Sequence, residues 1–425
     1  MHKIITLENG LRVILVPFEG TDACTFLAYC KVGSRYEYKE INGAAHFIEH
    51  MMFKGTKKRH RTIDISRVLD AMGAEYNAFT GKETTGYYVK SDFKHAKTSI
   101  ELLHDMLFNS RFDARELERE RGVIVEEINM YKDNPMMHID ELLESEMYEG
   151  STLGWEIGGS HQTVQSMTRQ QMIEFKQSYY SPDNMVVCLA GKINNDLLTA
   201  VKKTFGKEKQ ATDTQRGFCK YSSLPSQKIV KARVQYKDTA QIQFALGFPA
   251  FAISDKRTPA LDLLSVILGG TMSSRLFISV RERKGLAYYI RAFGDSYTDT
   301  GAFIVQAGLD KSRLKLAYKT ILSELRKIKK EKVSASEIKE AKDHISGKIA
   351  LRMENSYDRA DWYAKTQLYF GKVITPQQRL AEIQKVTPAQ IQAVARQVLD
   401  EKKMTVAGIG PYKTKQSLLG ILHKA

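Results

Sequence analysis

The chain contains a weak internal repeat, which indicates how it folds. Its two copies lie at residues 164–172 and 383–391, and in each a Thr is followed three residues later by a Gln. That spacing predicts a capping box at the start of an amphipathic helix. Each helix leads into an apolar strand, at residues 185–191 and 404–408. The repeat therefore predicts two α+β halves of similar plan.

The predicted domain boundaries follow this repeat. The chain has 425 residues, more than one ordinary domain contains, and 43% of them are hydrophobic, which is ample for a core. Residues 207–217 are polar and aperiodic, as is typical of a linker. We therefore expect an N-terminal domain over residues 1–206, a linker over 207–228 and a C-terminal domain over 229–425.

The first half contains His46, Glu49 and His50 in the order H-x-x-E-H. Two histidines four residues apart project from one face of a helix and can bind one Zn²⁺ together. A carboxylate beside them can take a proton from a metal-activated water, as peptide hydrolysis requires. The order inverts H-E-x-x-H and is a zinc-peptidase signature. The alternative is three polar residues on an exposed face, but the neighbours are largely apolar, so the helix is expected to be buried.

A third protein ligand is predicted on a second helix, over residues 113–131. Asp113 is the expected N-cap, and helical spacing places Glu120 and Glu127 on the apolar stripe while Glu126 points roughly the opposite way. A buried carboxylate needs a cation or a metal as its partner. Taken alone, this segment fits equally well a solvated acidic helix paired with its own arginines. The two histidines favour Glu127 as a ligand.

These motifs resemble the pitrilysin/insulinase superfamily of inverted-motif zinc peptidases, in the branch of mitochondrial processing peptidase and its bacterial relatives. That family has a ligand glutamate 77 positions after the second histidine, which here is Glu127, and another glutamate seven residues earlier, here Glu120. The resemblance implies that Glu120 supports and orients the metal site. The helix expected near residues 261–268 of the second half contains no histidine, so we expect one Zn²⁺ per chain.

The resemblance covers nearly the whole chain and extends to the substrate strand. It implies two similar α+β domains, each an antiparallel sheet with helices, which close like a clamshell on a peptide. Residues 73–89 predict two strands joined at Gly81-Lys82. The family pattern N-A-x-T matches residues 77–80, and in the family this edge strand pairs with extended substrate near the metal. The residues predicted to bind substrate are therefore Asn77, Ala78, Phe79 and Thr80.

Two further catalytic residues are implied by the second half. The run Ser273–Phe277, followed by residues 280–288, matches the family's S-S-R-L-F and R-E-x-x-G-L-A-Y patterns. In the family, the arginine and the tyrosine of the second run reach the active site of the first domain, and here they are Arg281 and Tyr288. A guanidinium can bind a substrate carbonyl, and a phenol can donate to an oxyanion. By composition alone, without the family match, the favoured interpretation is that Arg281 is a surface charge and Tyr288 a core residue.

Charge and composition limit the other possibilities. The formal net charge of +15 is compatible with nucleic-acid binding, but the lysines are spread over several predicted helices and no aromatic-plus-basic RNA motif occurs. No apolar stretch approaches the roughly 18 residues of a membrane span. The N-terminal residues lack a signal-peptide core, and the four cysteines show no C-x-x-C spacing. We expect a cytoplasmic protein with buried, reduced thiols and neither a membrane nor a nucleic-acid partner.

The sequence as a whole predicts a zinc metalloendopeptidase that acts on extended or unfolded peptides. A non-catalytic peptide-binding or scaffold subunit of a processing-peptidase-like complex is the alternative. Such subunits typically lose the H-x-x-E-H residues, whereas His46, Glu49 and His50 are all present here. Because the expected active site is complete in one chain, we expect a homodimer rather than two unlike subunits.

Overall fold

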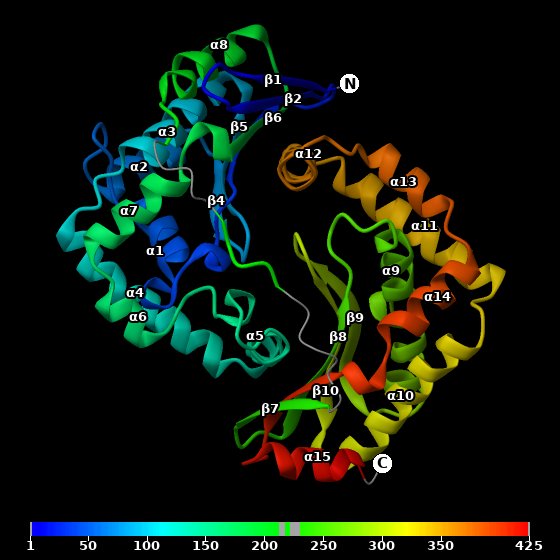
Figure 1. Ribbon diagram of the computed structural model, residues 1–425. Coiled ribbons are helices and arrows are strands. Elements are labelled where there is room, and N and C mark those ends of the chain that lie inside the picture. Colours follow the sequence, from blue (N-terminus) through cyan, green and yellow to red (C-terminus); the bar gives the residue numbers. More distant parts are fainter. Residues whose placement is uncertain (1, 212–216, 222–229, 424–425) are drawn as a thin grey trace. The chain divides into compact units, whose positions relative to one another are not determined.

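The structure is a computed structural model that describes residues 2–211, 217–221 and 230–423 (Figure 1). The chain divides into two compact units, each built from three segments. Unit 1 comprises Met1–Asn129, Trp155–Cys219 and Ile349–Thr375. Unit 2 comprises Met130–Gly154, Lys220–Lys348 and Pro376–Ala425.

Unit 1 is built on a six-stranded sheet in the order β1-β2-β6-β3-β5-β4. The strands are β1 (Lys3–Thr6), β2 (Arg12–Pro17), β3 (Ala23–Cys30), β4 (Glu75–Thr80), β5 (Thr85–Asp92) and β6 (Met185–Gly191). The helices of this unit are α1 (Ala44–Met51), α2 (Thr62–Ala71), α3 (Ala96–Asn109), α4 (Ala114–Asp133), α6 (His161–Ser166), α7 (Arg169–Tyr179), α8 (Asn195–Lys203) and α12 (Ser356–Phe370).

Unit 2 is built on a five-stranded sheet in the order β7-β11-β8-β10-β9. The strands are β7 (Lys231–Tyr236), β8 (Gln241–Ala250), β9 (Ala287–Ser296), β10 (Gly301–Asp310) and β11 (Thr405–Gly410). The helices are α5 (Pro135–Met147), α9 (Thr258–Ser265), α10 (Leu314–Lys330), α11 (Ala335–Arg352), α13 (Pro376–Gln384), α14 (Pro388–Val398) and α15 (Lys415–His423).

The predicted α+β class and the repeated plan are confirmed. Thr168 opens α7 and Thr387 opens α14, each through the capping box expected from the sequence. Each of these helices is followed by the expected central strand, β6 or β11. The sheets are mixed rather than wholly antiparallel, because β6 pairs parallel with β2 and β11 pairs parallel with β7. A strand that enters beside the first strand after a helical crossover can run parallel to it.

One face of each sheet is covered by a helix from the other half of the sequence. In unit 1, Ala360, Ala364 and Leu368 of α12 pack on apolar side chains of β2, β3 and β6. In unit 2, Leu142 and Leu143 of α5 pack on β8 and β11. The units therefore differ from the continuous domains expected at 1–206 and 229–425, because α5 and α12 bury their apolar faces on those sheets. The larger part of the expected linker, residues 212–216 and 222–229, lies outside the described residues.

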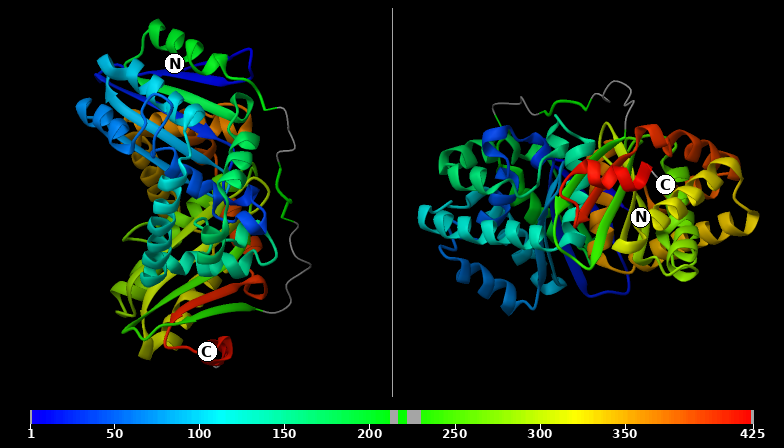
Figure 2. Two further views of the ribbon diagram at one scale, coloured as in Figure 1. Left: turned by 90° about the vertical axis from the view of Figure 1, so that its left-hand side faces the viewer. Right: turned by 90° about the horizontal axis from the view of Figure 1, so that it is seen from below.

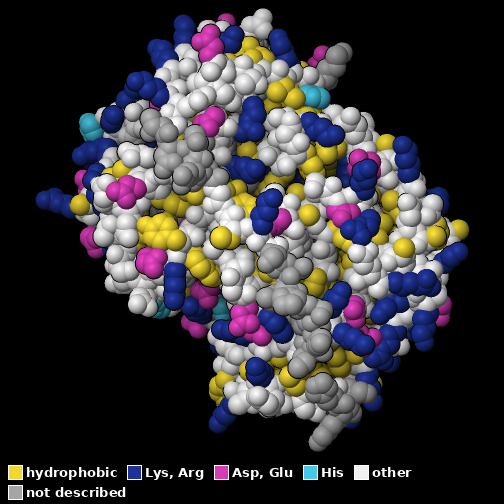
Figure 3. All heavy atoms as spheres, in the orientation of Figure 1, with side chains coloured by type: hydrophobic (Ala, Val, Ile, Leu, Met, Phe, Trp, Pro, Cys, Tyr) yellow, Lys and Arg dark blue, Asp and Glu magenta, His cyan; other side chains and the backbone are white. Residues whose placement is uncertain are grey.

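The N-terminus belongs to unit 1 and the C-terminal helix α15 to unit 2, and both ends are marked in each view of Figure 2. On the face shown in Figure 3, Lys and Arg side chains are scattered among acidic ones. Within the described ranges, none of the helices has the length and apolarity needed to cross a bilayer. Cys24, Cys30 and Cys188 are buried thiols, as expected, but the expectation is wrong for Cys219, which is exposed in the segment that follows residue 216.

Candidate active site

The helix that carries the predicted histidines, α1, is short and is held by its apolar face and by its N-terminus. Phe47, Ile48 and Met51 are fully buried in the core of unit 1. At its N-terminus the buried carboxylate of Glu37 accepts hydrogen bonds from the Gly43 and Ala45 backbone amides, both at 2.8 Å. These are donors that the helix itself leaves unpaired, and a negative charge is favourable there. The backbone positions of His46, Glu49 and His50 are therefore fixed by the core contacts of α1 and by the Glu37 cap.

Helix α4 has the phase expected from the sequence. Asp113 caps it by accepting from the Arg115 amide at 3.0 Å, and its apolar stripe is buried. Glu126 is exposed, whereas Glu127 is half-buried and Glu120 is buried. The interpretation of this segment as a fully solvated acidic helix is thus wrong for its inner face.

The structure brings His46, His50 and Glu127 together. The two Nε2 atoms lie 3.2 Å apart, and the Glu127 Oε2 atom lies 3.7 Å from the first and 3.4 Å from the second. Two ligands of one tetrahedral Zn²⁺ are separated by about 3.3 Å, given metal–ligand bonds of about 2.0–2.1 Å. The three donor atoms therefore have the chemistry and the spacing of a zinc site. Within the described part of the chain, no other His/Cys/Asp/Glu group converges in this way.

A second layer of contacts orients the histidines. The His50 Nδ1 atom lies 2.9 Å from Glu120 Oε1, so a proton on Nδ1 leaves Nε2 free to bind a metal. The other oxygen of Glu120 forms an ion pair with Lys54 Nζ at 2.6 Å. The His46 Nδ1 atom is buried and has no hydrogen-bond partner among the described residues, and Gly158 faces it.

Charges in this cluster shift its pKa values in opposite directions. Burial and the neighbouring His50 lower the pKa of His46 to about 4. Burial also lowers the pKa of His50, but Glu120 and Glu127 outweigh it and raise the value to about 9. The hydrogen bond with His50 lowers the pKa of Glu127. Without a metal, one imidazole is thus held neutral and its neighbour protonated, and a divalent cation would replace that proton.

Glu49 lies between the two histidines on α1 and has a different partner. Its Oε2 atom accepts a hydrogen bond from the Thr80 hydroxyl at 2.5 Å. Burial raises the pKa of Glu49, and the Thr80 hydrogen bond offsets part of that rise. Thr80 ends β4, which is the edge strand of the sheet, as the sequence predicted. The remaining predicted substrate residues, Asn77, Ala78 and Phe79, precede it on the same strand.

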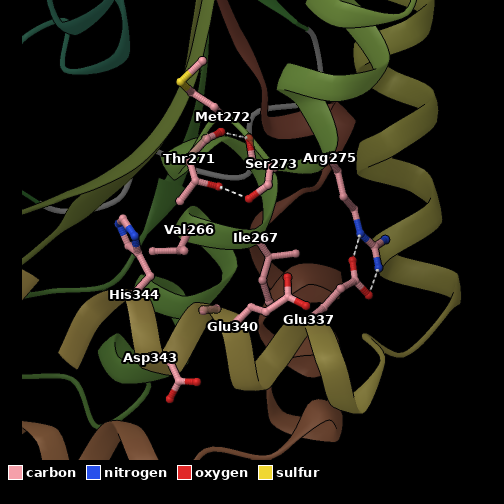
Figure 4. Close-up of a pocket in the computed structure, with 12 residues that line it drawn as sticks. Val266, Ile267, Thr271, Met272, Ser273, Arg275, Glu337, Glu340, Asp343 and His344 are labelled. Carbon is pink, nitrogen blue, oxygen red and sulfur yellow. Dashed lines mark hydrogen bonds and ion pairs between the residues drawn. The ribbon is translucent and has the colours of Figure 1, made fainter. Parts of the chain in front are cut away.

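Arg281 and Tyr288 belong to unit 2 and remain predictions as catalytic residues. Arg281 lies in the π-helical segment η8 (Phe277–Glu282), with its guanidinium 4.7 Å from the centre of the Phe277 ring. Tyr288 is on β9 and its side chain is 72% exposed, so the interpretation of it as a core residue is wrong. Neither residue lines the hollow of about 520 Å³ in unit 2, whose lining includes Arg275 with its guanidinium paired with both oxygens of Glu337 (Figure 4).

Comparisons with known proteins concern the family to which this chain belongs. Residues 12–161 match the family described as insulinase (peptidase family M16), and residues 166–345 match the peptidase M16 inactive domain. An uncharacterized zinc protease of Bacillus subtilis is 33% identical over 94% of this chain and 96% of its own length. The chain belongs to the insulinase family of peptidases. Another uncharacterized zinc protease of the family, from Streptomyces coelicolor, is 34% identical over 97% of the chain and 90% of its own length.

Solved structures extend the family's likeness to the fold. A protease from Helicobacter pylori has a TM-score of 0.92 and 25% identity, with 97% of this chain and 99% of that chain covered. An M16-like peptidase from Alicyclobacillus acidocaldarius has a TM-score of 0.85 at 20% identity, over 97% and 98% of the two chains, and shows the fold alone. All three converging side chains, His46, His50 and Glu127, lie within the range matched to the insulinase family.

Sequence reasoning missed several side chains that hold this insulinase-family site. Lys54 lies four residues after His50, one helical turn on, so its spacing could have drawn attention to it. Glu37 has no such signal, because it precedes α1 in an irregular segment and reaches the amides only through the fold. Thr80 was predicted as part of the substrate strand, and its bond to Glu49 was not foreseen.

Proposed function

We propose that this chain is a zinc-dependent endopeptidase that hydrolyses extended or unfolded peptides, with one Zn²⁺ per chain. The observation that carries the proposal is the convergence of the His46, His50 and Glu127 donor atoms at 3.2 to 3.7 Å from one another. Two neutral nitrogens and one carboxylate oxygen leave a fourth tetrahedral position open, as in catalytic rather than structural zinc sites.

In this proposal Glu49 and Glu120 have different roles in the reaction. A bound Zn²⁺ supplies Lewis acidity that polarises the scissile carbonyl and makes a water molecule more acidic. Glu49 accepts the proton of the attacking water and returns it to the departing amine. Burial raises the pKa of Glu49 toward neutral pH, which suits a group that must both accept and return a proton. Glu120 keeps the His50 ring in the orientation that presents Nε2.

Substrate binding is assigned to β4 and to two residues of unit 2. An edge strand has unpaired amides and carbonyls, so Asn77–Thr80 can pair with the main chain of a peptide and read little of its sequence. Arg281 and Tyr288 are proposed to stabilise charge on the carbonyl oxygen in the transition state. We further propose a cytoplasmic homodimer, because each chain would carry a complete set of catalytic residues.

The competing function is a non-catalytic subunit that binds peptides. It uses the same edge strand but has no need for a carboxylate between two metal-ligand candidates. The presence of Glu49 together with its hydrogen bond from Thr80 favours the enzyme.

Replacement of Glu49 by Gln distinguishes these two functions. The variant keeps the volume of the side chain and the three ligand candidates, so it should bind about one zinc per chain and lose peptide hydrolysis. Zinc content by elemental analysis and cleavage of a panel of unfolded peptides measure the two quantities on the same sample. Hydrolysis by Glu49→Gln at the wild-type rate would rule out Glu49 as the base.

A further inference from the structure

We infer that Thr80 is a positioning residue for Glu49, and that the edge strand proposed to bind substrate thereby also orients the proposed base. The inference rests on the proposed function. It starts from one contact, the hydrogen bond of 2.5 Å from Thr80 Oγ1 to Glu49 Oε2. Among the described residues this is the one hydrogen bond that the Glu49 carboxylate makes.

A carboxylate with a single hydrogen bond depends on that bond for its orientation. Glu49 has three side-chain torsions, and the packing of α1 fixes its Cα but not its carboxylate. The hydroxyl of Thr80 holds Oε2 and leaves Oε1 available to a water molecule. Hydrogen bonds to charged groups are stronger than those between neutral groups, so this bond can select one rotamer over its competitors.

The position of Thr80 is itself well determined. It is paired with Thr85 across the β4–β5 hairpin, and Gly81 N donates to Thr84 O at 2.8 Å to close the turn. The turn is fastened to the segment after β3, where Arg35 N donates to Lys82 O at 2.8 Å. The buried ion pair of Arg35 with Glu83, at 2.5 Å, lies at the same place.

The close approach of these two segments leaves no space for a side chain between them. A Cβ on Gly33 would lie 2.1 Å from the Gly81 carbonyl oxygen, so this position requires glycine. The end of β4 is therefore clamped to the body of unit 1, although β4 is an edge strand. A rigid strand end is a suitable support for a group that must hold the base within a fraction of an ångström.

This arrangement connects peptide binding with base orientation. A peptide paired to β4 would form hydrogen bonds with the backbone of that strand. The last side chain of the same strand, Thr80, holds Glu49. Thr80 would then act on turnover through its hydroxyl, whereas its backbone acts on binding. The two roles are separable, because substitution of the side chain leaves the backbone groups in place.

Three variants of the full-length zinc-loaded protein test the inference. Thr80→Val removes the hydroxyl but keeps the branched shape, and kcat should fall about 10- to 100-fold with KM and zinc content nearly unchanged. Thr80→Ser keeps the hydroxyl and should retain most of kcat. Thr85→Val is the matched control, because Thr85 is opposite Thr80 but its hydroxyl donates to Val32 O at 2.9 Å. It should leave kcat within a few-fold of wild type.

A binding measurement separates positioning from substrate contact. In the Glu49→Gln background, Thr80→Val should leave the dissociation constant of a fluorescent unfolded peptide unchanged. A wild-type kcat for Thr80→Val, an equal loss in Thr80→Ser or Thr85→Val, or a weaker peptide affinity in that background would each overturn the inference. If Glu49→Gln is inactive and Thr80→Val turns over at the wild-type rate, the inference alone fails. If Glu49→Gln is fully active, the proposed function fails and the inference with it.

Discussion

The two units share a plan but differ in the chemistry of equivalent elements. In each sheet the last strand along the chain, β6 or β11, is parallel to one neighbour and antiparallel to the other. Helix α1 follows β2 and β3 in unit 1, and helix α9 follows β7 and β8 in unit 2. Helix α1 carries His46, Glu49 and His50, whereas α9 contains no histidine, is mostly buried and continues into the π-helical segment η7 (Val266–Gly270). The same scaffold thus supports either a polar site or core packing.

The two helices also differ in how much of their surface is buried. In α1 the apolar residues face the core, the two histidines contact Glu127 of α4, and Glu49 contacts Thr80 of β4. In α9 nearly every residue is buried, so no face remains for ligands. Function in such a fold follows from the site and not from the scaffold. Four predictions compare the two units experimentally.

The largest effect is expected for Glu127→Gln, since it would remove the third ligand and make unit 1 resemble unit 2. Bound zinc should fall from about one per chain to a small fraction after dialysis against a weak chelator, and hydrolysis should be lost. Glu126→Gln on the exposed side of α4 is the control and should keep both. Equal zinc loss in the two variants would show that the helix phase does not determine the ligand.

Arg281→Ala and Tyr288→Phe test whether unit 2 contributes to the chemistry at all. Each should lower turnover by about 10²- to 10³-fold, the usual cost of losing one oxyanion donor. Zinc content should stay at the wild-type value, since neither residue belongs to unit 1. Arg275→Ala is a useful comparison, because that guanidinium is already paired with Glu337. Full activity in both test variants would confine the proposed active site to unit 1.

Much of this asymmetry could be predicted from the sequence, because it depends on local spacing. The i, i+4 histidines, the phase of α4 and the capping boxes of α7 and α14 all involve residues within two or three helical turns. The packing of α5 on the sheet of unit 2 and of α12 on the sheet of unit 1 could not be predicted. An apolar helix face does not specify which sheet will cover it. The bond from Thr80 to Glu49 and the cap from Glu37 also depend on tertiary structure.

The packing of α5 and α12 gives the third prediction, in which the units should behave alike. Leu368 of α12 and Leu143 of α5 are both buried against the sheet of their unit. Replacement of either by Ala should lower the free energy of unfolding by about 2–5 kcal/mol. Leu351→Ala, at a side chain that is 73% exposed, should change it by less than about 0.5 kcal/mol. Urea midpoints measure all three, and an unchanged midpoint for Leu368→Ala would deny α12 a structural role in unit 1.

The smallest effect concerns Glu120, which touches the site through His50. Glu120→Gln should weaken zinc binding by about 10- to 100-fold, because the amide orients the ring less firmly. The deficit should also depend on pH. The wild-type His50 has a pKa of about 9 in the metal-free site, so zinc must displace its proton at pH 7. Removal of the Glu120 charge lowers that pKa, which helps zinc at pH 7 and opposes the loss of orientation.

The zinc affinities of the wild-type protein and of Glu120→Gln should depend differently on pH. Between pH 7 and 9 the wild-type His50 loses its proton and zinc affinity should rise close to tenfold per pH unit until the pKa is reached. The variant completes the same deprotonation at lower pH, so its affinity should rise less over this range. The gap between the two proteins should therefore widen from pH 7 to pH 9. Competition with a chelator of known affinity at pH 7, 8 and 9 measures it, and a constant gap would mean that Glu120 orients His50 without stabilising its proton.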